Sequence, residues 1–400
     1  MRIGIDYTSA LRQAAGIGRY TRELVRAVLA LKNGHRFALF AAAGGLPEER
    51  WREQGEGLRL LGGQALDICT VPVTDDWLAR IWHRLRVPIP VELAIGPIDV
   101  FYSPDFTLPP TRRSTGNLLT VHDLSFIHHP EAFVPRLRQY LERVVPRSIE
   151  RADRVLADSE HTRSDLMALF NVPGAKVRVI TPGVDSRFHP PEKDQPVETR
   201  RHPIARKANR LPASVRGRYD IADVPYALSV GTLQPRKNYV RLIRAFARMR
   251  ERVKDDIQLL IGGGHGWLFE PILEEASKHE WVNLLGFVEE EDLPALYRGA
   301  ALFAFPSLYE GFGLPVLEAM ASGVPVVCSD SSSLPEVAGD GALLIDPLDV
   351  DGLGSAMARI WEDDGLRAAM INRGLAQAAG FSWHTSARKL LETIDSLEVR

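Results

Sequence analysis

The 400-residue sequence predicts an α/β protein with two domains, each built on a doubly wound parallel β-sheet. Short apolar runs alternate with amphipathic helical patterns through both halves, which is typical of parallel strands joined by right-handed crossovers. Proline and basic residues interrupt this alternation near the middle of the chain. The length suits two domains of ordinary size, so we expect one sheet on each side of the interruption.

The first domain is predicted over residues 1–185. Two helical patterns, at 19–32 and 136–150, lie between apolar runs of strand length. The candidate strands are 2–6, 36–41, 66–71, 98–102, 117–121, 154–158 and 176–180.

Residues 186–218 break the alternation and are predicted to be an interdomain linker that carries a basic insertion. Pro190, Pro191 and Pro196 oppose regular structure, and nine Lys or Arg residues lie between positions 187 and 218. A solvated loop without a binding role explains this composition equally well.

The second domain is predicted over residues 219–380, where the alternation is cleaner. A last helical segment, 381–400, follows it. The candidate strands are 226–230, 257–261, 282–285, 301–305, 324–328 and 342–345. The candidate helices are 238–252, 268–278, 291–298, 314–322 and 352–363.

Composition excludes several classes of protein. A net charge of −2 gives no global attraction to nucleic acid. The amino terminus reads as a strand rather than a secretory signal, and no run approaches the ~20 apolar residues that span a bilayer. We therefore expect a cytoplasmic protein, with or without peripheral contact to the inner face of the membrane.

The segment 307–327 is the most informative part of the chain. Glu310 and the glycines of Gly311-Phe312-Gly313-Leu314 follow a buried strand, and Pro315 suits the first turn of a helix. A helix amino terminus offers backbone N–H groups and partial positive charge to an anion. A carboxylate beside an anion site suggests a ligand that carries both phosphate and hydroxyl groups, such as a sugar nucleotide.

Glu310 and Glu318, separated by seven residues, resemble the E-x7-E motif of the retaining family-4 glycosyltransferases of the GT-B fold. Further matches are the segments Gly231-Thr-Leu-Gln-Pro-Arg-Lys-Asn238 and Val121-His-Asp123. The resemblance runs from about Gly16 to Trp383 and is strongest to the bacterial mannosyltransferase B-like group.

The resemblance implies two Rossmann-like domains facing across a cleft, with the last helix returning to the first domain. It implies transfer of a hexose, with GDP-mannose as the expected donor, to a hydroxyl of a saccharide or lipid-linked saccharide, in synthesis of a cell-surface polysaccharide or glycoconjugate. The residues it suggests for catalysis are His122, Arg236, Lys237 and Glu310. The residues expected to bind the donor are Gly16, Gly18, Thr232, Val288, Phe312, Gly313, Leu314 and Glu318.

Each assignment has a plainer alternative. Arg236 and Lys237 occupy a strand-to-helix loop, where a diphosphate would sit, but such a pair can also be an exposed basic loop. Glu310 could merely favour a helix dipole, and Glu318 could lie on a solvated helix face. Asp123 could orient His122 or cap the next segment.

Other functions on the same fold are a sugar-nucleotide epimerase, a phosphorylase or a non-catalytic sugar-nucleotide-binding subunit. The loop at Gly16 and Gly18 is not G-x-G-x-x-G, which disfavours a nicotinamide enzyme. Asp349-Val-Asp351 precedes a helical pattern, so we expect a helix cap rather than a metal site, and no metal cofactor.

An apolar stripe at helical spacing remains: Trp77, Leu78, Ile81, Trp82 and Leu85. A core-facing amphipathic helix is the common explanation of such a stripe. Contact with a membrane or with a lipid-linked acceptor is the alternative.

Overall fold

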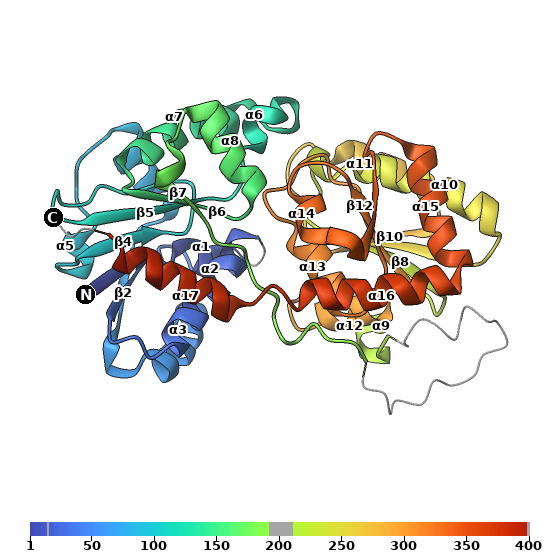
Figure 1. The fold of residues 1–400 in the computed structure, drawn as a ribbon, viewed down its shortest axis with the longest axis horizontal. Coiled ribbons are helices and arrows are strands. Elements are labelled where there is room, and N and C mark those ends of the chain that lie inside the picture. The colour runs from blue at the N-terminus through green and yellow to red at the C-terminus, as the bar shows by residue number, and fades with distance from the viewer. Residues whose placement is uncertain (14–15, 192–210, 398–400) are drawn as a thin grey trace. The chain divides into compact units, whose positions relative to one another are not determined.

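The computed structural model describes residues 1–13, 16–191 and 211–397, and the chain divides into two compact units (Figure 1). The first unit contains residues 1–124, 136–183 and 382–400, and the second contains residues 125–135 and 184–381. Each unit holds one parallel β-sheet.

The first sheet has seven strands in the order β3-β2-β1-β4-β5-β6-β7, and every pairing is parallel. The strand order reverses direction between β1 and β4. The strands are β1 (Arg2–Asp6), β2 (Arg36–Ala42), β3 (Leu66–Val71), β4 (Val100–Ser103), β5 (Gly116–Val121), β6 (Arg154–Ala157) and β7 (Val177–Val179).

Helices cover both faces of this sheet, with α7 and α8 on one face and α2, α3 and α17 on the other (Figure 1). The helices are α1 (Thr8–Arg12), α2 (Ile17–Ala30), α3 (Glu48–Gly62), α4 (Asp75–Leu78), α5 (Glu92–Ile95), α7 (Pro135–Arg151), α8 (Glu160–Phe170) and α17 (Trp383–Asp395). The short helical turns are η1 (Gly63–Ala65), the π-helical η2 (Ala79–Arg84) and η4 (Gly174–Lys176).

The second sheet has six parallel strands in the order β10-β9-β8-β11-β12-β13, which reverses between β8 and β11. The strands are β8 (Tyr226–Val230), β9 (Gln258–Gly262), β10 (Val282–Gly286), β11 (Leu302–Phe305), β12 (Val326–Ser329) and β13 (Ala342–Ile345). The main helices are α9 (Ala213–Arg218), α10 (Tyr239–Val253), α11 (Glu270–Ala276), α12 (Leu293–Gly299), α13 (Leu314–Ala321), α14 (Leu334–Ala338), α15 (Val350–Glu362) and α16 (Asp364–Ala378). Shorter turns are α6 (Ser125–His128), η3 (Pro130–Ala132), η5 (Pro235–Lys237) and η6 (Gly339–Gly341).

Successive residues of the central strands pack into different cores. In β9, Leu260 joins a core formed with α9, α12, α13 and α14, whereas Leu259 and Ile261 join a core formed with α10, α11 and α15. In β11, Phe303 and Leu302 divide in the same way. Because both faces of the sheet are covered, each of these strands reads as an unbroken apolar run rather than an alternating one.

The last helix packs in the first unit. Leu390 and Ile394 of α17 are buried in the same core as Leu24 and Val28 of α2. The helix begins where the chain passes Gly183: a Cβ built at Gly183 would lie 2.1 Å from the backbone nitrogen of Trp383. Only glycine allows two backbone segments to approach so closely.

Most of the segment expected to be a linker with a basic insertion lies outside the described residues. Its described ends, 186–191 and 211–218, are part of the second unit. Phe188, Leu211 and Val215 are buried in the core that also contains Leu296 and Phe303. Residues 125–135 also belong to this unit, where Trp267 Nε1 donates to the carbonyl oxygen of Ala132 at 2.6 Å.

The loops after β8 and β9 touch through glycine. Gly231 N donates to the carbonyl oxygen of Gly262, and Leu233 N donates to that of Gly264. A Cβ built on Gly263 would lie 2.0 Å from the carbonyl oxygen of Gly231, whereas a Cβ on Gly264 would meet nothing within 4 Å. The backbone of one loop therefore occupies the space that a side chain at position 263 would need.

We expect Gly263→Ala to lower the free energy of unfolding by about 2 kcal/mol, because backbone atoms cannot shift as a flexible side chain can. Gly264→Ala is the matched control and should change it by less than about 1 kcal/mol. Chemical denaturation of the two variants measures the difference. Equal stabilities would mean that the two loops are not in close contact.

Candidate active site

The candidate active site of the second unit lies where the strand order reverses. The loops after β8 and β11 leave adjacent strands at the carboxyl edge of the sheet. The loop after β8 contains Arg236 and Lys237, and the loop after β11 contains Glu310. In doubly wound sheets this reversal point opens a crevice in which ligands bind.

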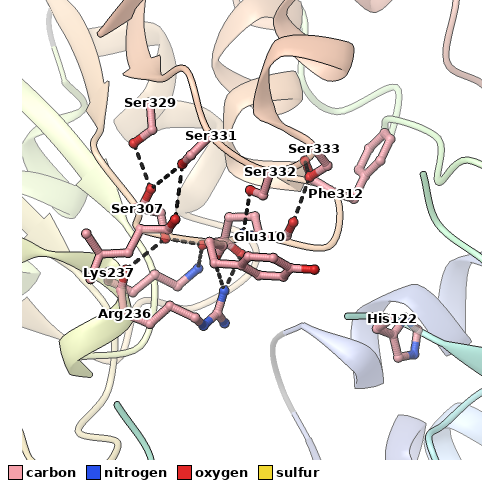
Figure 2. A network of polar contacts seen from close by, with 12 residues as sticks. His122, Arg236, Lys237, Ser307, Glu310, Phe312, Ser329, Ser331, Ser332 and Ser333 are labelled. Carbon is pink, nitrogen blue, oxygen red and sulfur yellow. Dashed lines mark hydrogen bonds and ion pairs between the residues drawn. The ribbon is translucent and has the colours of Figure 1, made fainter. Parts of the chain in front are cut away.

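These three side chains form a compact ion cluster (Figure 2). Lys237 Nζ lies 2.6 Å from Glu310 Oε1, and an Arg236 guanidinium nitrogen lies 2.9 Å from Glu310 Oε2. Lys237 is 9% exposed and Glu310 is 8% exposed, and the ammonium group also lies 4.8 Å from the ring centre of Phe305. Lys237 is therefore buried and the Arg236 side chain is only 11% exposed, so the pair is not an exposed basic loop.

The surroundings hold the Glu310 carboxylate in its ionised form. Burial by itself raises the pKa of Glu310, but the charges of Arg236 and Lys237, with hydrogen bonds from Lys237 and Ser307, outweigh burial and lower the pKa to about 2. At neutral pH this carboxylate has no proton to donate and can only accept hydrogen bonds or balance positive charge.

Ser307 connects the cluster to the backbone. Its hydroxyl oxygen lies 2.5 Å from Glu310 Oε1 and 3.1 Å from the carbonyl oxygen of Arg236. Leu308 N donates to the same Arg236 carbonyl at 2.8 Å, and an Arg236 guanidinium N–H donates to the carbonyl oxygen of Tyr309. The two loops are thus joined through both their side chains and their backbones.

Four serines at and just after the end of β12, which we call the serine run, support the loop that carries Glu310 (Figure 2): Ser329, Ser331, Ser332 and Ser333. Ser329 donates to the carbonyl oxygen of Ser307 at 2.7 Å, and the Ser333 hydroxyl lies between the carbonyl oxygens of Glu310 and Phe312, at 2.9 and 2.7 Å. The Ser332 hydroxyl accepts from the Glu310 N–H at 2.8 Å. Side-chain hydroxyls therefore satisfy polar backbone groups that no neighbouring strand could reach.

The end of this loop leads into α13. Gly313 has a φ of 115°, a conformation that favours glycine, and Pro315 lies in the first turn. No described residue accepts a hydrogen bond from the backbone N–H of Phe312, Gly313 or Leu314. These N–H groups and the helix dipole supply the donors that an anion needs, as the sequence predicts.

Asn238 links three loops of the second unit rather than capping a helix. It stands at the N-cap position of α10 with a φ of 61°, but its side chain makes no capping bond. Instead, Nδ2 donates to the carbonyl oxygens of Pro306 and Pro347, at 2.9 and 2.7 Å. The side chain thereby ties the loop after β8 to the loops after β11 and β13.

The remaining donor-site candidates of the second unit divide by burial. Glu318, on α13, is 2% exposed, so the solvated helix face is excluded for it. The Phe312 and Val288 side chains belong to the hydrophobic core, so a ligand could use only their backbone groups. Thr232 is half-buried in the loop after β8.

The first unit contains the remaining candidates. His122 follows β5 and is buried between the rings of Tyr20 and Phe106, at centroid distances of 4.9 and 5.5 Å. Its Nδ1 lies 2.7 Å from Asp158 Oδ2, and its Nε2 lies 3.0 Å from the carbonyl oxygen of Pro104. Because a carbonyl oxygen can only accept, Nε2 carries a hydrogen.

The His122 ring is held in its protonated form. Burial by itself lowers the pKa of His122, but the charge of Asp158 and its hydrogen bond, with smaller contributions from Asp105 and the Pro104 carbonyl, raise the pKa to about 9. The ring is therefore an imidazolium at neutral pH, and both of its N–H groups are already engaged.

The glycines expected near the donor lie at the start of α2. Gly16 is the N-cap residue with a φ of 58°. Gly18 packs against α1, where a Cβ would lie 2.1 Å from the carbonyl oxygen of Gln13. The close packing of α2 against α1 therefore explains the glycine at position 18 without a ligand.

Two observations bear on metals. Asp349 caps α15, and its Oδ1 accepts from Gly352 N at 2.8 Å, as the sequence predicts. Among the described residues, no group of three or more His, Cys, Asp or Glu side chains has an arrangement that could hold a metal ion.

Asp158, Ser307 and the serine run are not predicted from the sequence. Each follows a buried strand at the edge where the predicted residues lie, and β6, which precedes Asp158, pairs with β5, which precedes His122. Polar residues at the carboxyl ends of neighbouring strands are the signal that would have identified them.

Comparison with known proteins identifies the family. Residues 14–188 match the family model "Glycosyltransferase Family 4", and residues 216–377 match "Glycosyl transferases group 1". O-antigen chain mannosyltransferase B of Escherichia coli is 33% identical over 384 residues, which cover 92% of each chain. The chain belongs to the family-4 glycosyltransferases and is a glycosyltransferase.

Solved structures agree on the fold. Sucrose-phosphate synthase from Thermosynechococcus elongatus matches with a TM-score of 0.70 at 20% identity, covering 99% of this chain and 98% of that one. HepE of Anabaena, solved in complex with UDP and glucose, matches with a TM-score of 0.71 at 18% identity, covering 99% of this chain and all of that one. The two Rossmann-like units are those of the GT-B fold, which confirms the predicted fold class.

We expect Ser307→Ala to lower kcat roughly tenfold, with little change in donor KM, because it removes a charged hydrogen bond from Glu310. Ser329→Ala is the matched control: its hydroxyl, at the end of β12, is equally buried but bonds only a backbone carbonyl of the loop that carries Ser307. Steady-state kinetics on folded protein compare the two. Equal kcat losses would show that Ser307 acts on loop stability rather than on the carboxylate.

We expect the His122 ring to lose its proton near pH 9, as followed by NMR of histidine-labelled protein. Asp158→Asn should bring the pKa below 6.5, because burial then dominates, whereas Asp123→Asn should leave it near 9. Since the folded pKa exceeds the unfolded one, the pair stabilises the fold fully below pH 6.5, and this contribution disappears as pH rises through 9. A wild-type titration at 6.5 would contradict the assignment.

Proposed function

We propose that this glycosyltransferase moves a mannosyl group from GDP-mannose to a hydroxyl of a saccharide or lipid-linked saccharide, with retention of configuration, in the synthesis of a cell-surface polysaccharide. The observation that carries the proposal is the buried cluster of Arg236, Lys237 and Glu310 at the reversal point of the second sheet. Its net positive charge suits a sugar nucleotide in which the bond between the sugar and the β-phosphate is breaking.

The cluster carries a net positive charge and lies beside the amino terminus of α13. A departing nucleoside diphosphate gathers negative charge on its β-phosphate, which Arg236 can bind with two parallel hydrogen bonds and Lys237 as a point charge. Both groups are held in position before the reaction, so no reorganisation is needed in the transition state. With two cations available for the diphosphate, we expect transfer to continue in the presence of EDTA.

Glu310 has the properties of an acceptor of hydrogen bonds from the donor sugar. With a pKa of about 2 it is ionised at neutral pH. It can therefore bind sugar hydroxyls and stabilise a developing oxocarbenium charge, but it cannot act as a general acid. Glu318, one turn into α13, would bind the ribose hydroxyls.

The state of His122 limits the ways in which the acceptor can lose its proton. A ring that is protonated up to about pH 9 and bonded to Asp158 and Pro104 is not a general base at neutral pH. The leaving diphosphate is then the base that can take the acceptor proton, and His122 would bind a substrate hydroxyl only by exchanging its Pro104 partner for it.

The identity of the donor rests on similarity. The relative that covers 92% of this chain is named a mannosyltransferase of the O-antigen chain. The guanine would lie near Val288, after β10, where the Val288 side chain is buried and the exposed Phe287 side chain has no polar group, so backbone groups would form the hydrogen bonds. Backbone groups can pair with uracil as well, so the experiment must compare both bases.

The test incubates purified protein and a mannose-terminated oligosaccharide with GDP-mannose or with UDP-glucose, and identifies products by mass and anomeric NMR couplings. We expect an axially linked mannose from GDP-mannose alone. Glu310→Gln should mainly lower kcat, because its contact with the sugar strengthens in the transition state. Glu318→Gln should mainly raise donor KM, because its contact with the ribose is the same in the bound donor and in the transition state. Transfer from UDP-glucose alone would reject the donor, and an inverted product would reject retention.

A further inference from the structure

The segment 77–93 of the first unit exposes large apolar side chains. Leu85 is 72% exposed, Leu93 69%, Trp77 55% and Ile89 43%. The core-facing helix expected for the stripe at 77–85 is therefore wrong for its two ends. The segment forms the short α4 and the π-helical η2, which leave only the middle of the stripe half-buried.

The exposed loop after η2 is held in a defined conformation. Leu85 N donates to the carbonyl oxygen of Arg80 at 2.8 Å, and Val87 N donates to that of Ile81 at 3.0 Å. Trp82 Nε1 donates to the carbonyl oxygen of Ile89 at 3.0 Å. Since these bonds fix the backbone, the aliphatic side chains cannot retreat from water by local collapse of the loop.

Residues 77–91 of this segment are basic, although the exposed Asp75 and Asp76 precede them and the buried Glu92 follows. Residues 77–91 contain Arg80, Arg84 and Arg86 and no Asp or Glu. Among the described residues no carboxylate forms an ion pair with these three arginines, whereas Arg12 of the same unit pairs with Asp75 at 2.7 Å. Arg80 lies over the Trp77 ring, 5.1 Å from its centre. We call this set of exposed residues the docking surface: Trp77, Arg80, Arg84, Leu85, Arg86, Val87, Ile89 and Leu93.

We propose that the docking surface binds an anionic lipid bilayer. Leu85, Val87 and Ile89 alternate with Arg86 and Pro88 along one exposed loop, so exposed aliphatic and cationic groups are neighbours in the chain. This arrangement suits the boundary between acyl chains and headgroup phosphates, where arginine binds phosphate and its stem remains among apolar groups. Tryptophan is also enriched at that boundary.

None of the described helices has both the length and the apolar composition that crossing a bilayer requires, so any attachment through them would be peripheral. The inference rests on the proposed function in one respect: a lipid-linked acceptor is what would make docking useful. Vesicle binding is measured without donor or acceptor, so its failure is distinct from failure of the transfer assay.

The experiment measures sedimentation of the purified full chain with vesicles of phosphatidylcholine alone or mixed with phosphatidylglycerol. We expect binding to the anionic vesicles, weakened by salt. Leu85→Ser combined with Ile89→Ser should lower the partition coefficient at least tenfold. Arg84→Gln and Arg86→Gln should each lower it about fivefold.

Leu348→Ser is the matched control, since Leu348 is 58% exposed in the second unit, and it should bind like the wild type. Thermal unfolding of every variant should be unchanged, because the substituted side chains are exposed. Binding by the Leu85/Ile89 variant equal to wild type would overturn the proposal. So would no vesicle binding by the wild type, or a dimer in lipid-free solution that the same variant dissociates.

Discussion

The buried carboxylate of Glu310 is the constraint on which the organisation of the second unit depends. A buried charge is tolerated only when its partners compensate for the lost hydration, and removing one partner of a buried pair commonly costs 3–5 kcal/mol. Here the partners come from another loop, 73 residues earlier in the chain. Asn238 ties these two loops directly, while the glycine contacts at Gly231 brace the first loop against the loop after β9 and the serine run braces the second from β12.

The serine run links this constraint to ligand binding. Hydroxyls of Ser329 and Ser333 engage carbonyl oxygens of the loop that leads into α13. The backbone N–H groups at 312–314 are left without acceptors among the described residues. The loop thus separates its polar groups, with acceptors satisfied inside the protein and donors available at the edge of the sheet, where an anion is favoured.

The first unit also has a buried ionic pair at the carboxyl edge of its sheet, but the net charge of that pair differs from the net charge of the cluster in the second unit. His122 and Asp158 neutralise one another, whereas Arg236, Lys237 and Glu310 retain a net positive charge. A neutral pair orients hydrogen bonds without attracting an anion, and a positive cluster attracts one. The two units therefore share one architecture but present sheet edges of different charge.

The sequence by itself determined the elements and the motif. The strands and several long helices, such as α2, α7, α10 and α15, are predicted within a few residues, because apolar periodicity is a local property, and Asp349 is recognised as a cap for the same reason. Helices α3, α8 and α16 are not among the predicted helices. The segment around Glu310 identifies the family through its own residues. Tertiary structure alone decided which loops meet, since strand order places β8 beside β11 and β5 beside β6. It also decided that Asp158 holds His122, that Glu318 is buried and that the stripe at 77–85 ends in solvent. These outcomes depend on contacts between residues distant in sequence, and no local pattern encodes them.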